Sequence, residues 1–278
     1  MSKIINIGAL PLYSSIEEQQ HRKPYAFGKM WPLVSPRGIH PAFQFIIPKK
    51  IDNSKIQDAN VYRITETGEV IRKLSFFGLL YNYVKIQSFD EYTVVHTIPE
   101  LNTKNWHEQN GYLNQGYFYL ELKITDDDVY YSDVWASCID TQRCVILKYT
   151  NTYNFQIKGY SILFGSDIFE SVIYLNTGLG RPEYEFEEEA TNRLGYEYIE
   201  SQVSKKVYRF NFIAPEYLLD AMRLIRLCDS KTCIYENETY DMLNFNIEPR
   251  WEEQGDLASV EASFETDNII TNIGGFAS

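Results

Sequence analysis

The spacing of apolar residues changes at Pro215, and this change limits what the flanking segments can form. Before the proline, aromatic residues recur at every second position: Tyr208, Phe210 and Phe212. A period of two is typical of a half-buried strand. After it, large apolar residues recur at helical spacing: Leu218, Met222 and Ile225. Since proline is tolerated at the first helical position, the sequence predicts a strand that runs directly into a helix over 215–228, packed on a sheet.

The segments after this helix alternate again and predict more sheet. Two short β-type runs, 232–235 and 239–243, flank the polar turn 236–238 and predict a hairpin. Pro249 interrupts the next run, so that strand is expected at a sheet edge or at a bulge. The last regular run has apolar residues on one face: Ala258, Val260, Ala262 and Phe264.

The first half of the chain also predicts strands, because short alternating runs are separated by turn signals. The residues 66–68 and 126–128 are the turn signals of two hairpins, and 22 tyrosines and 16 phenylalanines suit pleated sheets. We therefore predict a mainly β protein, with an N-terminal immunoglobulin-like β-sandwich over residues 42–140. A β-rich α+β domain follows over residues 141–278, and the boundary is expected near Ser137 to Arg143.

Residues 1–41 differ from the rest and predict an extended, proline-rich arm. Five prolines lie between residues 8 and 41, so neither a helix nor a strand can run far there. The same segment carries Phe27, Trp31 and Leu33, which favours docking on a neighbouring subunit. The alternative is an irregular segment packed on its own domain. The arm interpretation predicts that a chain without residues 1–38 still folds but assembles poorly.

We predict no catalytic, cofactor-binding or metal site. Five carboxylates are candidates for a glycosidase pair, and the sequence singles out none of them: Asp133, Glu183, Glu185, Glu187 and Glu252. The four histidines lie in no signature with serine or cysteine: His21, His40, His96 and His107. Asp126, Asp127 and Asp128 lack the glycine and the terminal glutamate of a calcium loop, so a hairpin turn explains them better. Phosphate-binding glycine motifs are missing as well.

Net charge and cysteine content limit which partners and which cellular compartment the sequence fits. The net charge of −12 argues against sequence-specific nucleic-acid binding, and no apolar run approaches the ~20 residues needed for membrane insertion. The apolar stretch in the first residues is too weak for a signal peptide, so we expect synthesis in the cytoplasm. The four cysteines form no C-x-x-C pair: Cys138, Cys144, Cys228 and Cys233. Two disulfides are conceivable, but buried thiols in a reducing cell are the favoured interpretation.

Several stretches resemble structural proteins of phages. The segment GYFYLELKITDDDVYYSDVW resembles a hairpin found in tail-region virion proteins of Bacteroides-infecting phages. The later segments RPEYEFEEE, KKVYRFNFIAPEYLLDAMRLIRLCD and WEEQGDLASVEASFET are similar to structural proteins from the same gene neighbourhoods, including those of crAss-like phages. The resemblance covers most of residues 110–270. It implies a virion component of the neck, tail hub or baseplate, present in several copies and without catalytic residues.

Three functions of different classes follow as hypotheses. The first is a phage virion structural protein of the tail or neck, which forms a ring-like homo-oligomer and contacts other virion proteins. The second is a glycan-binding β-sandwich module for attachment to the host surface, because aromatic and acidic side chains can line a sugar site. The third is a hydrolase, which the sequence supports least.

Overall fold

The computed structural model of the chain describes residues 4–21, 33–37, 39–52, 55–75, 84–98, 116–138, 141–165, 167–251, 257–266 and 269–272. Strand residues make up 59% and helical residues 8%, so the prediction of a mainly β protein is confirmed. The elements in chain order are β1 (Ile5–Asn6), β2 (Leu12–Tyr13), α1 (Ile16–His21), β3 (Leu33–Pro36), β4 (Gln44–Ile47), β5 (Asp58–Ile64), β6 (Val70–Ser75), β7 (Val84–Ser88), β8 (Thr93–Thr97), β9 (Gly116–Lys123), β10 (Val129–Ser132), β11 (Trp135–Cys138), β12 (Val145–Thr150), β13 (Phe155–Ile157), β14 (Tyr160–Ile162), β15 (Ser171–Leu175), β16 (Glu183–Arg193), β17 (Tyr196–Pro215), α4 (Glu216–Met222), the 3₁₀ helix η3 (Arg223–Leu227), β18 (Ser230–Tyr235), β19 (Glu238–Asp241), β20 (Leu243–Trp251), β21 (Leu257–Glu265) and β22 (Ile269–Asn272).

Three large sheets organise the described residues. The largest runs in the order β19-β18-β12-β15-β3-β11-β9-β10-β2, with β5 and β6 branching from β9. A second sheet runs β16-β17-β21-β20, with β22 also paired to β17, and a third runs β1-β4-β8-β7. A small hairpin, β13-β14, stands apart. Nearly all strand pairs are antiparallel, but β3 and β11 run parallel from Leu33↔Trp135 to Pro36↔Cys138.

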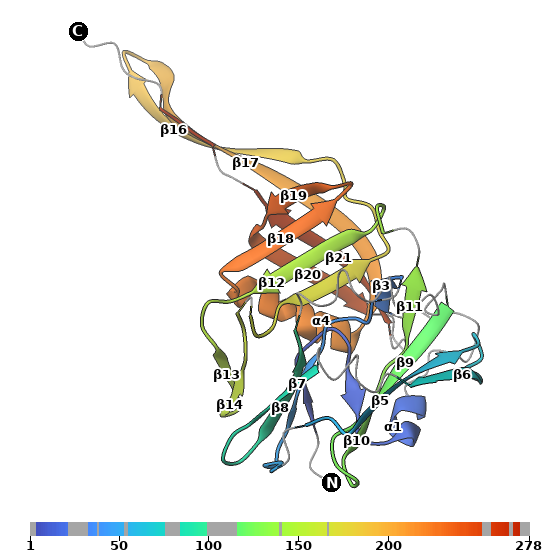
Figure 1. Cartoon of the computed structure of the whole chain (residues 1–278). Coiled ribbons are helices and arrows are strands. Elements are labelled where there is room, and N and C mark those ends of the chain that lie inside the picture. Colours follow the sequence, from blue (N-terminus) through green and yellow to red (C-terminus); the bar gives the residue numbers. More distant parts are fainter. Residues whose placement is uncertain are drawn as a thin grey trace.

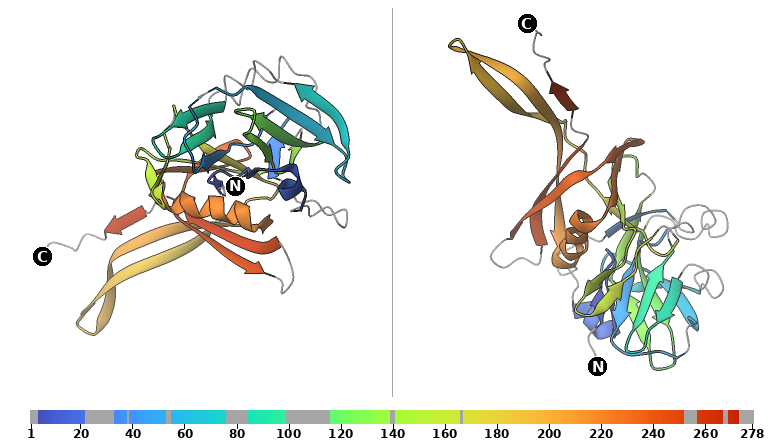
Figure 2. Two further views of the ribbon diagram at one scale, coloured as in Figure 1. Left: turned by 90° about the horizontal axis from the view of Figure 1, so that it is seen from below. Right: turned by 90° about the vertical axis from the view of Figure 1, so that its left-hand side faces the viewer.

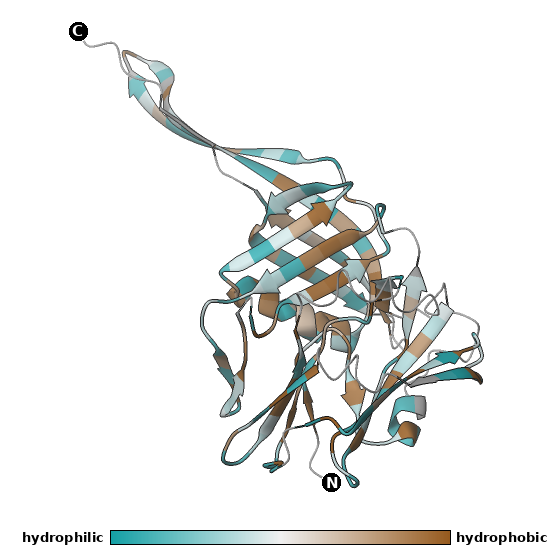
Figure 3. Ribbon diagram, in the orientation of Figure 1, coloured by the Kyte–Doolittle hydropathy of each residue, from teal (hydrophilic) through white to brown (hydrophobic). Residues whose placement is uncertain are grey.

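The sheets pack face to face around one large core, and a small separate cluster contains Ile64, Tyr119 and Val134 (Figure 1). In the upper part, the β19-β18-β12 end of the largest sheet covers β17 and β21, and the rings of Tyr208 and Tyr240 lie 4.9 Å apart across this interface. In the lower part, the β1-β4-β8-β7 sheet faces β9 and β10, with Phe45 and Tyr130 at 5.1 Å. Figure 3 shows hydrophobic residues concentrated on the strands of these packed layers.

The predicted strand-to-helix transition is confirmed, with a different helix length. Pro215 is extended (φ −74°, ψ 162°) and immediately precedes α4. The α-helix has seven residues and continues as the five-residue η3, so the single helix predicted over 215–228 tightens halfway. Short 3₁₀ turns commonly end α-helices and redirect the chain quickly, here into β18. The predicted apolar stripe is buried: Leu218, Met222 and Ile225.

The predicted hairpins are also confirmed. Glu236 and Asn237 both have positive φ, as in the two-residue turns that match the twist of the flanking strands, here β18 and β19. The residues 126–128 turn β9 into β10, and Asp128 pairs there with Lys49. As the position of Pro249 indicates, β20 pairs only with β21 among the described residues and carries a register shift.

The expectation of a detached N-terminal arm is corrected by the described parts of that segment. Residues 9–13 are buried, and β3 lies inside the largest sheet between β15 and β11. Asn6 on β1 fixes the position of β2, because its side chain accepts a hydrogen bond from the Leu12 amide at 2.8 Å and donates one to the Leu12 carbonyl at 3.1 Å. The prolines do break the segment into short elements, but these elements pack on their own chain. Phe27 and Trp31 lie outside the described residues.

The finer prediction of an immunoglobulin-like sandwich is not confirmed. The largest sheet contains strands from both sides of the expected boundary at 137–143, because β12 and β15 belong to it together with β9 and β11. Tyr174 on β15 pairs with Val34 on β3, so the hydrogen-bonded sheet continues across the two halves.

Candidate assembly surface

A long hairpin projects from the body of the molecule and is its most exposed feature (Figures 1 and 2). Strands β16 and β17 pair from Glu183↔Val207 out to Arg193↔Tyr196. Leu194 and Gly195 close the tip with φ of 55° and 85°, the left-handed conformation of a tight hairpin turn. On the other side of β17, β22 pairs with residues 201–204. We call residues 183–206 together with β22 the blade.

One face of the blade continues the face of β17 that is buried in the body. In the body this face is covered by the β19-β18-β12 end of the largest sheet, and the blade extends beyond that cover. In the body, Tyr208 and Phe210 on β17 are buried. Strand residues alternate between two faces, so Lys206 and Ser204 continue this same face toward the tip. Their cross-strand neighbours are Tyr184 and Phe186, which are 59% and 58% exposed. An aromatic face that is core in the body is therefore open on the blade.

The tip carries further apolar surface. Leu194 is 100% exposed and Tyr196 is 70% exposed. Burying a side chain of this size stabilises a folded or associated state by roughly 1.5–3 kcal/mol, so these two side chains would stabilise any contact that covered them.

The opposite face of the blade is charged. Glu183 accepts from Arg209 at 3.1 Å, and Glu187 pairs with Lys205. The Glu187 carboxylate raises the pKa of the Lys205 ammonium, although exposed pairs of this kind contribute little to stability. With five glutamates between residues 183 and 189, β16 keeps an excess of negative charge. The blade thus carries both exposed apolar side chains and an excess of negative charge. Figure 3 shows much of it in teal, the colour of hydrophilic residues.

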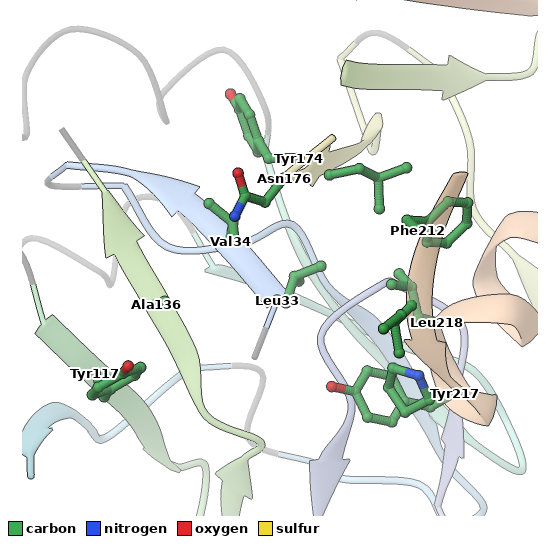
Figure 4. A pocket seen from close by; sticks show the side chains of 12 residues that line it. Leu33, Val34, Tyr117, Ala136, Tyr174, Asn176, Phe212, Tyr217 and Leu218 are labelled. Atoms are coloured by element: carbon green, nitrogen blue, oxygen red, sulfur yellow. The ribbon is translucent and has the colours of Figure 1, made fainter. Parts of the chain in front are cut away.

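A groove of about 360 Å³ lies where the two halves of the molecule meet (Figure 4). Strands β3, β11 and β15 line one side, and β17 with α4 lines the other. The lining is mostly apolar with a few tyrosine and amide groups: Leu33, Val34, Tyr117, Ala136, Tyr174, Leu175, Asn176, Phe212, Ile213, Pro215, Tyr217 and Leu218. These residues include no carboxylate, histidine or cysteine, and their only titratable groups are the hydroxyls of Tyr117, Tyr174 and Tyr217.

A cluster of polar and aromatic side chains lies on β5 and β9. The rings of Tyr62 and Tyr119 stack at 4.8 Å. Glu121 accepts from the Asn60 amide at 2.8 Å and from the Tyr62 hydroxyl at 3.3 Å. Burial, followed by the Glu121 carboxylate, raises the pKa of Tyr62. Stacked aromatic rings beside a carboxylate and an amide can contact the faces and hydroxyls of a sugar.

The carboxylates considered from sequence do not converge on one site. Asp133 is nearly buried and accepts from the backbone N–H of the next residue, Val134, at 2.7 Å. The candidates Glu183, Glu185 and Glu187 all lie on β16 of the blade, and Glu252 lies outside the described residues. Among the residues that the structure describes, no group of three or more histidine, cysteine, aspartate or glutamate side chains is placed to hold a metal ion.

The cysteine side chains that the structure describes are buried: Cys144, Cys228 and Cys233. Burial raises the pKa of Cys228 and of Cys233 to about 12, so both thiols stay protonated and unreactive at neutral pH. The side chain of Cys138 lies outside the described residues.

Two of the four histidines, His40 just before β4 and His96 on β8, are buried. Burial lowers the pKa of His40 and of His96 to about 4, from an ordinary value of 6.5. His40 donates to the Pro41 carbonyl at 2.9 Å, while Lys85 adds a smaller depression at His96. The side chain of His21 and the whole of His107 lie outside the described residues.

These buried imidazoles predict a loss of stability in mild acid. The unfolded chain takes up protons near pH 6.5, but the folded chain does not until about pH 4. The free energy of unfolding should therefore fall as the pH drops from 6.5 to 4, by up to about 3 kcal/mol per histidine. Urea titrations across this range measure the slope. His96→Phe should remove about half of it, and an unchanged slope in that variant would contradict the assignment.

The sequence interpretation missed the blade. Most of RPEYEFEEE belongs to β16, at the edge of its sheet. However, β17 begins at Tyr196 and has 20 residues, which is far longer than the strand expected before Pro215. The period of two in Glu183-Tyr184-Glu185-Phe186-Glu187 was the available signal.

The comparisons with known proteins leave the family open. No protein-family model matches the sequence, and no curated protein matches it significantly. Within the described ranges, none of the helices is long and apolar enough to cross a membrane.

Proposed function

We propose that this chain is a structural protein of a phage virion, placed in the neck, tail hub or baseplate, and that it works by assembling into a ring of identical copies. The observation that carries the proposal is the blade, whose aromatic face and tip are exposed on the single chain. The resemblance to tail-region virion proteins supports the same function.

Assembly explains why a chain would keep such a surface. Exposed apolar side chains on a long projecting hairpin lower solubility, unless a partner covers them. A contact between the blade and a different patch on the next copy is heterologous, and a heterologous contact that closes on itself produces a ring. We propose no catalytic step, and we propose synthesis in the host cytoplasm with final location in the virion beside other tail or neck proteins.

The proposal predicts self-association through the blade. Purified protein should show a concentration-dependent oligomer in sedimentation velocity, and the chain should be found in several copies in purified virions. Tyr184→Ser with Phe186→Ser should weaken association by on the order of a hundredfold, because two apolar side chains no longer become buried. The melting temperature should hardly change, since both residues are exposed.

A matched control separates this effect from general surface polarity. Tyr153 is 77% exposed in the loop between β12 and β13, away from the blade, so Tyr153→Ser should associate as the parent chain does. A parent protein that stays monomeric at all concentrations, and is absent from virions, would contradict the proposed function.

The glycan-binding alternative rests on the cluster of Tyr62, Tyr119 and Glu121. The facing of the β1-β4-β8-β7 sheet and β9-β10 supports a sandwich-like unit that could present this cluster, and an immunoglobulin-like sandwich remains part of this alternative. Binding of bacterial-surface glycans that Tyr62→Ala abolishes would favour this function over assembly. Retained binding in the same variant would exclude the cluster as the sugar site.

A further inference from the structure

Among the open sheet edges in the described part of the chain, those of β16 and β6 are chemically opposite. Strand β16 has a partner strand only on its β17 side, and β6 has one only on its β5 side. The free side of an edge strand presents backbone N–H and C=O groups that can pair with another strand.

Both edge strands are uncovered on their two faces. On β6, the consecutive residues Val70 and Ile71 are 55% and 58% exposed. The next two residues, Arg72 and Lys73, are regularly paired and exposed as well, and since such consecutive strand residues point to opposite faces, neither face of β6 is covered at this point. On β16, Tyr184 and Phe186 are exposed on one face, while Glu185 and Glu187 are exposed on the other.

Their charges are complementary. Strand β6 follows its apolar pair with the exposed Arg72 and Lys73, and Arg63 on β5 lies directly opposite Arg72. This is a cationic strip on a chain of net charge −12. Strand β16 carries five glutamates in seven residues. Complementary charge along two facing strands favours this pairing over self-pairing of either strand, which would place like charges together.

The two edges cannot meet within one chain. The blade points away from the body at one end of the molecule, whereas β6 lies at the other end (Figures 1 and 2). A partner for either edge must therefore come from another molecule, and the same chain supplies a matching edge at its opposite end.

We propose that β16 of one subunit pairs along the open edge of β6 in a second copy of this chain. The inference rests on the proposed assembly function and specifies its contact. It joins the blade sheet of one copy to the largest sheet of the next. Since the donor and acceptor edges are different patches, each subunit donates once and accepts once, which extends the assembly in one direction until it closes.

Charge-reversal variants test this contact by sedimentation velocity. Glu185→Lys with Glu189→Lys alters β16 and spares Glu183 and Glu187, whose carboxylates form ion pairs with Arg209 and Lys205. Arg72→Glu with Lys73→Glu alters β6. Each double variant alone should self-associate at least about tenfold more weakly than the parent chain, because its own edges now repel. A mixture of the two should restore association through the reversed pair.

A charge-matched control and a cross-linking test accompany these variants. Lys50→Glu with Lys55→Glu makes the same charge change at exposed loop positions and should associate as the parent does. A Phe186→Cys chain mixed with an Ile71→Cys chain should form a disulfide-linked dimer, at several times the yield of either chain alone.

The outcomes separate the two proposals. If the parent chain forms oligomers while both charge-reversal variants associate normally and the cysteine mixture does not cross-link, this contact is wrong and the proposed function stands. If the parent chain does not self-associate, this contact is wrong, and if it is also absent from virions, the proposed function is wrong as well. Circular dichroism on each variant confirms that lost association is not lost folding.

Discussion

A chain that lacks residues 1–38 is expected not to fold. The deletion removes β3, which lies between β15 and β11 in the largest sheet. Strand β15 would lose its contact with Val34, and β11 would lose four parallel pairings. The two ends of the sheet would then no longer be joined through β3, so their exposed edges would favour aggregation.

The deletion also opens the core. It removes buried side chains from the first segment: Ile7, Ala9, Leu10, Leu12, Tyr13 and Leu33. Each large apolar side chain contributes roughly 1.5–3 kcal/mol on burial, and domains are stable by only about 5–15 kcal/mol in total. The loss of five such side chains is therefore as large as the stability of the whole domain, before the lost strand pairings are counted. Far-ultraviolet circular dichroism and a thermal scan should show no cooperative transition in the truncated chain.

Shortening the blade provides the control for this deletion. Glu187 and Val203 face each other in the hairpin, so an Asn-Gly turn can join them in place of residues 188–202. This change removes exposed residues and leaves the body intact. The short-blade chain should melt cooperatively near the temperature of the parent. A cooperative transition in the chain without residues 1–38 would show instead that the segment is a dispensable arm.

The second large effect is expected at the helix. Ile225→Ala should lower the free energy of unfolding by about 2–5 kcal/mol, because Ile225 is fully buried in η3 and its loss leaves a cavity in the common core. The surrounding groups have little freedom to fill that space. The Tyr149 hydroxyl, itself buried, donates to the Ala221 carbonyl at 3.0 Å and ties this part of the chain to β12.

Leu227 supplies a matched control on the same 3₁₀ helix. It is 63% exposed, two residues beyond Ile225, so Leu227→Ala should change the unfolding free energy by less than about 0.5 kcal/mol. Urea denaturation at pH 7 compares the two variants directly. Equal effects at both positions would mean that the helix does not bury the face described above.

The elements that sequence predicted well are those that depend on neighbouring residues. The alternation of Tyr208 and Phe210, the change of period at Pro215 and the turn at Glu236 and Asn237 are local, and each is present in the structure. A side chain's periodic placement follows from the geometry of the strand or helix itself, so the pattern is readable without knowledge of the partner. The helix length was less predictable, because the tightening into η3 accompanies the turn of the chain into β18.

Partners distant in the chain were decided only by the tertiary structure. The proline spacing of the first segment predicts short elements, but it does not show that β3 inserts beside β11, about 100 residues away. In the blade, Tyr184 and Phe186 alternate with glutamates as they would in a strand with one buried face. They are exposed because the β19-β18-β12 layer, which covers the same face in the body, does not reach them. Local pattern thus determined which segments are strands, and which face is apolar. Long-range packing decided which strands are neighbours and which apolar faces stay uncovered, because burial depends on surfaces that the local sequence does not contain.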